Sequence, residues 1–283
     1  MTKFKISYKK LYLIEKEKNK EQEEEIKKLN EIIEELKKEK GYLCLKNGKK
    51  YEETNYNIVK YCKLNDKPFN TQKSVEELGG ATSKNDLQCN FQEEKDFGIE
   101  IKKYNTPDWM QCSIKYNDET KNWESSNKSK IPLESKKVFD ELLKNIKLFD
   151  GKIPPFMEKK LTHKEWITIK NQTTQWDDTY ITVPSDTISK LYDAKNTNYI
   201  QISKGYGLFH TGNDICNFGI PLFENEQQIR IRTKIHAKNK KGYCSISVMA
   251  SCQPKNVKNI IPSKYSLDCV ERLPPSLVYN NNL

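Results

Sequence analysis

The chain has 283 residues, a formal net charge of +10 and a pI near 9.0. This length allows one large domain or two small ones with a buried core. No apolar run approaches the length of a membrane span, and residues 1–10 lack the apolar core of a secretory signal, so we expect neither a membrane protein nor a secreted one.

The positive charge comes almost entirely from lysine, since the only arginines are Arg230, Arg232 and Arg272. A basic chain favours a polyanionic partner such as nucleic acid, because lysines neutralise phosphates without reading sequence. The alternative is a lysine-coated protein without such a partner, whose composition reflects an AT-rich genome.

The eight cysteines form no CxxC pair and none has zinc-ligand spacing with a histidine. Buried thiols are the simplest interpretation, and they indicate a reducing compartment. We therefore expect an intracellular protein, in the cytoplasm or, for a viral protein, in the cytoplasm or nucleus of the host cell.

The first expected element is a charged helix over residues 9–40, ended by Gly41. An apolar stripe steps along it at three- and four-residue intervals, through Ile26, Leu29, Ile33 and Leu36. The stripe lasts about two heptads, whereas a sustained coiled coil needs roughly three to four. A helix packed on its own domain and a homodimeric coiled coil both stay open, and the short stripe favours the first.

Residues 41–150 have a mixed pattern. A short helix is expected to end near Leu78, before Gly79-Gly80, and strands are expected over 86–91 and 97–103. Helices are predicted over 107–116, started by Thr106 and Pro107, and over 135–149.

Residues 151–283 are rich in strand patterns. The predicted strands cover 180–183, 199–203, 207–209, 228–238 and 243–250. The fold class is therefore α+β, with a long N-terminal helix, a mixed core to about residue 150 and a β-rich second half. A second half that shares one sheet with the core and one that forms its own sheet both stay open.

The two strands at 86–103 carry the pattern that points most directly to chemistry. Side chains alternate along a strand, so Glu100 and Lys102 share a face, and Asp86 on the neighbouring strand can join them. Two carboxylates, with the carbonyl of Ile101, suit a hard cation such as Mg²⁺, with Mn²⁺ as a substitute. A nearby lysine can hold the attacking water or stabilise charge at a phosphate.

The competing interpretation is an ordinary solvent-facing pair, because Glu-x-Lys arises by chance in a lysine-rich chain. Four features favour a site. Asp86 lies at hairpin distance, a Gly-Gly break precedes it, the strand around Glu100 is otherwise apolar, and the aromatic-rich helix expected over 107–116 follows directly.

The segment Gly80-x-x-Ser83-Lys84-x-Asp86, followed by Glu100-x-Lys102, resembles the restriction-endonuclease-like PD-(D/E)xK nuclease superfamily, found in restriction systems, large DNA viruses and phages. The resemblance implies a central mixed sheet flanked by helices. It also implies that Asp86 and Glu100 are metal ligands and Lys102 is the catalytic lysine.

Further positions follow from the same resemblance. Glu77 matches an acid that some members place on the preceding helix, and Gln111 a glutamine on the following helix. Ser83 and Lys84 would contact DNA. Asn85 departs from the motif, which has proline there.

A second candidate surface is the alternating strand 229–238. Its basic residues share one face and would contact DNA phosphates or guanine edges. They are Arg230, Arg232, Lys234, His236 and Lys238. A half-buried strand with a solvated outer face is the alternative.

The sequence thus predicts a Mg²⁺-dependent endonuclease acting on double-stranded DNA, with a helix at 1–40, a nuclease core at 41–150 and a DNA-contacting half at 151–283. Two rivals remain: a non-catalytic nucleic-acid-binding protein on the same fold, and an interaction protein organised by the N-terminal helix.

Overall fold

The computed structural model describes residues 8–65, 67–68, 70–73, 85–91, 95–144 and 146–280. The chain divides into two compact units, Met1–Lys50 and Tyr51–Leu283. The predicted short helix ending at Leu78 lies outside the described residues.

The N-terminal helix α1 is longer than the sequence pattern predicts, since it covers Tyr8–Val59 and passes through Gly41 and Gly48. The predicted end at Gly41 is wrong. A glycine ends a helix when it turns to a left-handed conformation, but inside a helix it costs only about 1 kcal/mol. Strong helix formers surround Gly41, and they carry the helix through it.

The second unit contains a five-stranded mixed sheet, in the order β10-β9-β5-β4-β3. β3, β4 and β5 form an antiparallel meander, and β9 pairs in parallel with β5. The bounds are Asn70–Lys73 for β3, Leu87–Phe91 for β4, Lys95–Lys102 for β5, Thr197–Ile202 for β9 and Gly207–His210 for β10. This sheet therefore combines strands from both sides of residue 150.

The two faces of this mixed sheet are buried against different partners. Phe97, Ile99 and Ile101 of β5 pack with Val59, at the end of α1, in one apolar cluster. Ile200 of β9 instead faces a second cluster that contains much of helix α4 (Thr187–Asp193). The alternation along β5 therefore turns Glu100 and Lys102 away from the Ile99 side.

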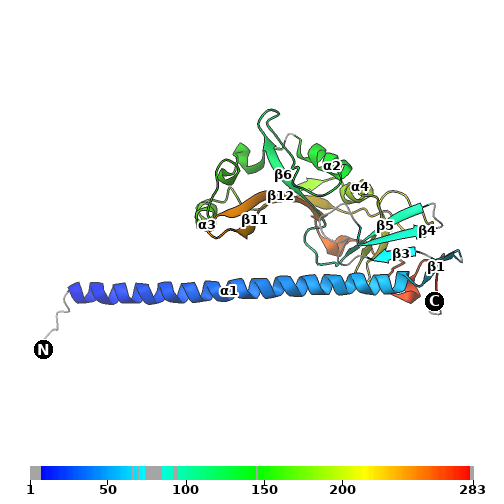
Figure 1. Ribbon diagram of the computed structural model, residues 1–283, viewed down its shortest axis with the longest axis horizontal. Helices are drawn as coiled ribbons and strands as arrows, with labels where there is room; N and C mark the ends of the chain where they lie inside the picture. The colour runs from blue at the N-terminus through cyan, green and yellow to red at the C-terminus, as the bar shows by residue number, and fades with distance from the viewer. Residues whose placement is uncertain are drawn as a thin grey trace. The chain divides into compact units, whose positions relative to one another are not determined.

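A second five-stranded sheet, entirely antiparallel, has the order β7-β6-β12-β11-β8. α4 lies between the two sheets (Figure 1). The strand bounds are Met110–Asn117 for β6, Asn122–Ser125 for β7, Thr179–Val183 for β8, Gln227–Lys238 for β11 and Cys244–Pro254 for β12.

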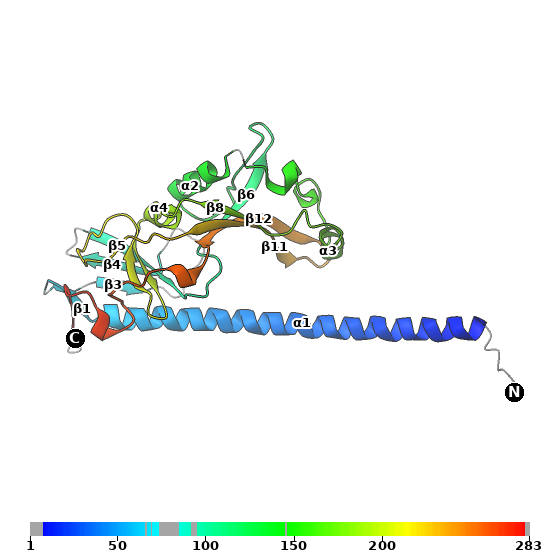
Figure 2. The same ribbon diagram turned by 180° about the vertical axis from the view of Figure 1, so that it is seen from behind.

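A small antiparallel sheet joins the two ends of the second unit, because β13 pairs with β1 and β1 with β2. Figure 2 shows β1 beside the C-terminus. The bounds are Cys62–Leu64 for β1, Lys67–Pro68 for β2 and Leu277–Tyr279 for β13. The remaining helices are α2 (Leu133–Leu143), α3 (His163–Asn171) and the 3-10 turns Leu148–Gly151, Pro155–Met157, Val257–Asn259 and Val270–Arg272.

Two helix predictions need correction. Residues 107–116 do not form a helix, since Met110–Asn117 is strand β6. Met110, Cys112 and Ile114 are buried in alternation with more exposed neighbours, which is the period of a strand. The helix predicted over 135–149 ends at Leu143 and is followed by a separate 3-10 turn.

The α+β class with a long N-terminal helix is confirmed. None of the helices in the described ranges is long and apolar enough to cross a membrane.

Candidate functional site

The centre of the candidate site is the carboxylate of Glu100 on β5. Its Oε1 accepts a hydrogen bond from Lys102 Nζ at 2.6 Å, and its Oε2 accepts one from Lys195 Nζ at 2.8 Å. The three side chains are 5%, 13% and 3% exposed, in the order Glu100, Lys102 and Lys195. The prediction that Glu100 and Lys102 lie on one face of β5 is therefore confirmed, and both side chains are buried.

Lys195 reaches Glu100 because of the turn between α4 and β9. Its backbone N–H donates to the carbonyl of Tyr192, and the next residue, Asn196, has a φ of 59°. Asparagine tolerates this left-handed conformation better than most residues. The turn leads directly into β9, the parallel neighbour of β5.

Asp86 lies just before β4 and contacts the backbone of β5. Its Oδ2 accepts a hydrogen bond of 2.8 Å from the N–H of Ile101, between Glu100 and Lys102. Asp86 is buried, at 7% exposure. The structure therefore brings Asp86 to the same stretch of β5 as Glu100 and Lys102, as the sequence predicts.

Asn85, which stands where the family motif has proline, anchors the start of β4. Its Oδ1 accepts a hydrogen bond of 2.5 Å from Thr197 Oγ1, and its Nδ2 donates to Gln88 Oε1 and to the carbonyl of Asn196. The amide fills the space beside Gly98, where a Cβ would lie 2.0 Å from Asn85 Nδ2. Asn85 thus links β4 to the start of β9 and fixes the backbone next to Asp86.

The aromatic ring of Tyr192 on α4 covers the lysines. The amines of Lys102 and Lys195 each lie 5.8 Å from the ring centroid, within the range of a cation–π contact. Its hydroxyl donates to the carbonyl of Trp109 at 2.7 Å. No sequence spacing points to Tyr192 or Lys195, because both lie far along the chain from the strand pair.

The pKa values of the two buried carboxylates, Asp86 and Glu100, are shifted in opposite directions. Burial, and then the neighbouring charge of Glu100, raise the pKa of Asp86 to about 7; the more distant charge of Glu52 on α1 adds to this. Burial also acts to raise the pKa of Glu100, but the charges of Lys102 and Lys195 outweigh it and leave that pKa below its ordinary value. The site therefore holds one firmly ionised carboxylate and one that titrates near neutral pH.

Lys102 stays protonated in this arrangement. Burial acts to lower its pKa, but the charge of Glu100 outweighs burial and raises the pKa well above the ordinary value. A lysine held in this state stabilises negative charge and does not accept a proton.

The donor chemistry suits a hard cation, although no group of three or more His, Cys, Asp or Glu side chains converges as a metal site in the described part of the chain. Mg²⁺ commonly takes one or two carboxylates and completes its shell with water and substrate phosphate. Among the described residues, no lysine or arginine forms an ion pair with Asp86, although the charge of Lys102 acts to lower its pKa. Both oxygens of Glu100 already accept lysine hydrogen bonds, so a metal there would share or displace one lysine.

The predicted helix residue Gln111 does not join the site. It lies on β6 in the antiparallel sheet, opposite Ser251 of β12, whereas Asp86 and Glu100 belong to the mixed sheet. Its predicted place on a helix is wrong because residues 110–117 alternate with a strand period. Glu77, Ser83 and Lys84 lie outside the described residues.

The basic strand β11 has the predicted alternation, with Ile229 and Ile231 buried on the opposite face. However, acidic residues pair with its arginines. Arg232 Nη2 lies 2.7 Å from Asp108 Oδ2, and Arg230 lies 2.5 Å from Asp178 and 3.5 Å from Asp108. Acidic residues from outside the strand therefore compensate the charge of its two arginines.

The other basic residues on that face of β11 have fewer acidic partners among the described residues. Lys234 is half-buried with no ion pair among the described residues. The backbone of Lys238 pairs with Cys244, and its side chain is not described. Contact of this face with DNA stays a prediction.

No family model matches the chain, and no curated protein or solved structure resembles it closely enough to count as a relative.

Proposed function

We propose that the protein is a metal-dependent endonuclease of double-stranded DNA, with Asp86, Glu100 and Lys102 at its active site. The observation that carries the proposal is the burial of two carboxylates and a charged lysine within one short stretch of paired strands. Such groups are costly to bury, and perturbed titration is common where chemistry takes place.

The residues have distinct roles in this proposal. Asp86, Glu100 and the carbonyl of Ile101 would hold Mg²⁺, which when bound polarises a phosphate and lowers the pKa of water. Lys102 remains charged, so it stabilises negative charge developing on the phosphate. Lys195 positions the Glu100 carboxylate from the opposite side.

The sheet supports the same proposal. The resemblance to restriction-endonuclease-like proteins implies a mixed sheet flanked by helices, and here the last turns of α1 and helix α4 pack on opposite faces of such a sheet. The net charge of +10 favours a polyanionic substrate.

Incubation of the purified chain with supercoiled plasmid tests the proposal. We expect nicked and linear products with Mg²⁺ or Mn²⁺ and none with a chelator. Asp86→Asn and Glu100→Gln should abolish cleavage while the chain stays folded. Asp96→Asn is the matched control, because Asp96 is an exposed acid on the same strand. Full cleavage by Glu100→Gln would refute the site.

A non-catalytic nucleic-acid-binding protein is the second candidate, and one observation favours it. Both oxygens of Glu100 are engaged by lysines, as in a buried ion-pair network with a structural role. DNA binding without cleavage, and without any rise in melting temperature on addition of Mg²⁺, would support this candidate over the nuclease.

For the first unit we propose self-association through α1. Ile26 and Ile33 occupy heptad position a, and Leu29 and Leu36 position d, the combination that favours parallel two-stranded coiled coils. Because the helix continues past Gly41, Leu43 occupies the next d position. These five residues are 45–58% exposed.

Sedimentation tests this association. A dimer is expected for the native chain and a monomer for Leu29→Asp, which places a charge in the stripe. Lys27→Asp, at a position outside the stripe, should remain dimeric. A monomeric native chain would contradict the proposal.

A further inference from the structure

A cavity of about 480 Å³ lies in the second unit, distant in the fold from Glu100. It is formed where the end of the β11–β12 hairpin meets the segment before α3 and the loop after β7. This volume falls within the roughly 300–1,000 Å³ typical of ligand sites. Its lining residues include Lys128, Lys159, Lys160, Leu161, Tyr243 and Cys244.

Backbone hydrogen bonds fix the walls of this cavity. Cys244 N donates to the carbonyl of Leu161 at 3.1 Å, and His163 N donates to the carbonyl of Gly242 at 3.1 Å. The side chain of Asn239 accepts from the N–H of Tyr243 at 3.1 Å. The hairpin end and the start of α3 are therefore joined by hydrogen bonds on one side of the cavity.

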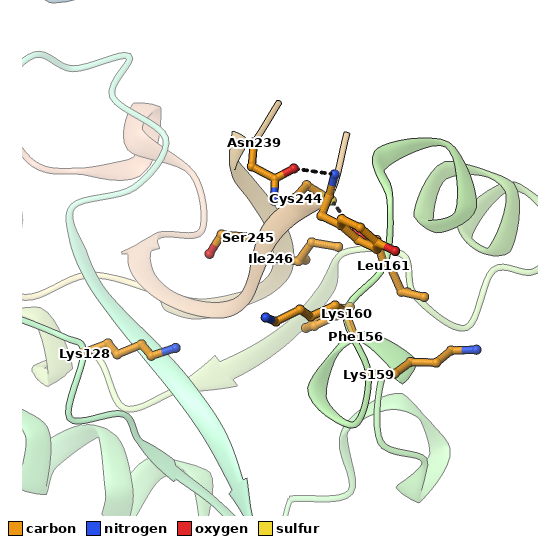
Figure 3. Close-up of a pocket in the computed structure, with 10 residues that line it drawn as sticks. Lys128, Phe156, Lys159, Lys160, Leu161, Asn239, Cys244, Ser245 and Ile246 are labelled. Atoms are coloured by element: carbon orange, nitrogen blue, oxygen red, sulfur yellow. Dashed lines mark hydrogen bonds between the residues drawn. The ribbon is translucent and has the colours of Figure 1, made fainter. Parts of the chain in front are cut away.

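The charge of the cavity is entirely positive. Three lysines line it, and none of its described lining residues is acidic. The amines of Lys128 and Lys160 point toward one another across the opening, whereas Lys159 points away (Figure 3). Neither Lys128 nor Lys160 has an ion-pair partner among the residues that the structure describes.

Lys159 differs from the other two in its electrostatic partner as well. Hydrogen bonds from Thr162, and then the charge of Lys159, lower the pKa of Glu165. Lys159 thus interacts electrostatically with the carboxylate of Glu165, which lies outside the cavity. The uncompensated charge at the opening belongs to Lys128 and Lys160.

An aromatic side chain completes the site. Tyr243 is 39% exposed at the cavity, although it lies at a hairpin end held by backbone bonds. Exposed aromatic rings beside lysines are the combination that binds single-stranded nucleic acid, with bases stacking on the rings and phosphates on the amines.

We propose that this cavity binds an unpaired nucleotide of a nucleic acid strand, with its phosphate between Lys128 and Lys160 and its base on Tyr243. The proposal rests on the proposed function for its choice of nucleic acid as the ligand. It adds a strand-holding site separate from the site of cleavage.

The test is fluorescence anisotropy with a short labelled oligothymidylate in the presence of a chelator, over a series of salt concentrations. Lys128→Ala and Lys160→Ala should each weaken binding and reduce the salt slope by about 0.7, the value for one phosphate contact on a single strand. Lys159→Ala should change neither. Tyr243→Ala should weaken binding roughly 5- to 150-fold, the range for one stacked base, and Tyr243→Phe should not.

Three results would overturn the proposal: unchanged affinity and slope in Lys128→Ala and Lys160→Ala, an equal loss in Lys159→Ala, or inorganic phosphate competing as well as the strand. Equal binding of a duplex with no effect of Tyr243→Ala would overturn the assignment to an unpaired nucleotide. Because no metal is present, binding is measured without cleavage. Loss of plasmid cleavage alone therefore leaves this site standing, and loss of strand binding alone leaves the nuclease proposal standing.

Discussion

The amine of Lys195 lies 2.8 Å from the carboxylate of Glu100, although 95 residues separate them in the sequence. Removing one partner of a buried ion pair costs about 3–5 kcal/mol when it leaves an uncompensated charge. In Lys195→Met, Lys102 still contacts the other oxygen of Glu100, so we expect a smaller loss in the free energy of unfolding, about 1.5–3 kcal/mol for one buried hydrogen bond to a charged group, measured by urea denaturation.

Lys190→Met is the control for that measurement. Lys190 pairs with Asp186 on the same helix, but its side chain is 61% exposed, and exposed pairs contribute about 0–1 kcal/mol. Similar losses for the two variants would mean that the Lys195 contact is not buried in solution.

Asp86 predicts a pH dependence of stability. Its pKa of about 7 in the folded chain exceeds the ordinary value of 3.8, so the folded state holds the extra proton between these values. The stability that this extra proton contributes is complete below about pH 4 and is lost as the pH rises through 7. At about 1.4 kcal/mol per pKa unit, the loss in the free energy of unfolding is on the order of 4 kcal/mol.

Comparison with Asp86→Asn isolates this effect, because asparagine has the same shape and does not titrate. The variant should gain stability relative to the native chain as the pH rises from 4 to 8, and Mg²⁺ at pH 8 should raise the melting temperature of the native chain only. Asp96→Asn should follow the native curve. A constant difference between Asp86→Asn and the native chain would show that Asp86 titrates normally.

Substitution of two adjacent lysines distinguishes a specific role of Lys102 in cleavage from a general effect of positive charge. Lys102 contacts Glu100, whereas no side-chain contact is described for Lys103, the next residue. Lys102→Met should slow plasmid cleavage roughly 100- to 1,000-fold, the cost of losing one group that stabilises transition-state charge. Lys103→Met should cleave at nearly the native rate, and equal losses would contradict the assigned face of β5.

The acid between the two arginines predicts a purely structural effect. Asp108 is buried and contacts both Arg230 and Arg232, so Asp108→Asn should lower the free energy of unfolding by about 1.5–3 kcal/mol. Asp177→Asn, an exposed acid, should change it by less than about 0.5 kcal/mol. Urea denaturation measures both, and a neutral result for Asp108→Asn would mean that the arginines point to solvent.

The local parts of the fold could be predicted from the sequence. Strand alternation placed Glu100 and Lys102 on one face, and it located β4, β5 and the five later strands to within a few residues. These features depend on the period of polar and apolar side chains, which can be read from each segment without knowing its neighbours in the fold. The helix predicted at 107–116 failed because cap-like residues were given more weight than the alternation of Met110, Cys112 and Ile114.

The non-local parts could not be predicted. Lys195 and Tyr192 enter the site through the parallel pairing of β5 with β9, and no local pattern specifies which strands become neighbours. The same holds for Asp108, whose place beside Arg230 and Arg232 depends on the pairing of β6, β12 and β11. Counter-charges that come from residues far away in the sequence therefore cannot be predicted from local patterns.

The separation of Glu100 from its second lysine also sets an order of events during synthesis. A ribosome adds roughly 5–20 residues per second, so about 5–20 s pass between the emergence of Glu100 and that of Lys195, 95 residues later. Until then the nascent chain has no β9 beside β5 and no Tyr192 above the carboxylate. If the proposed cleavage is correct, a ribosome-bound chain cannot perform it before most of its length has been translated.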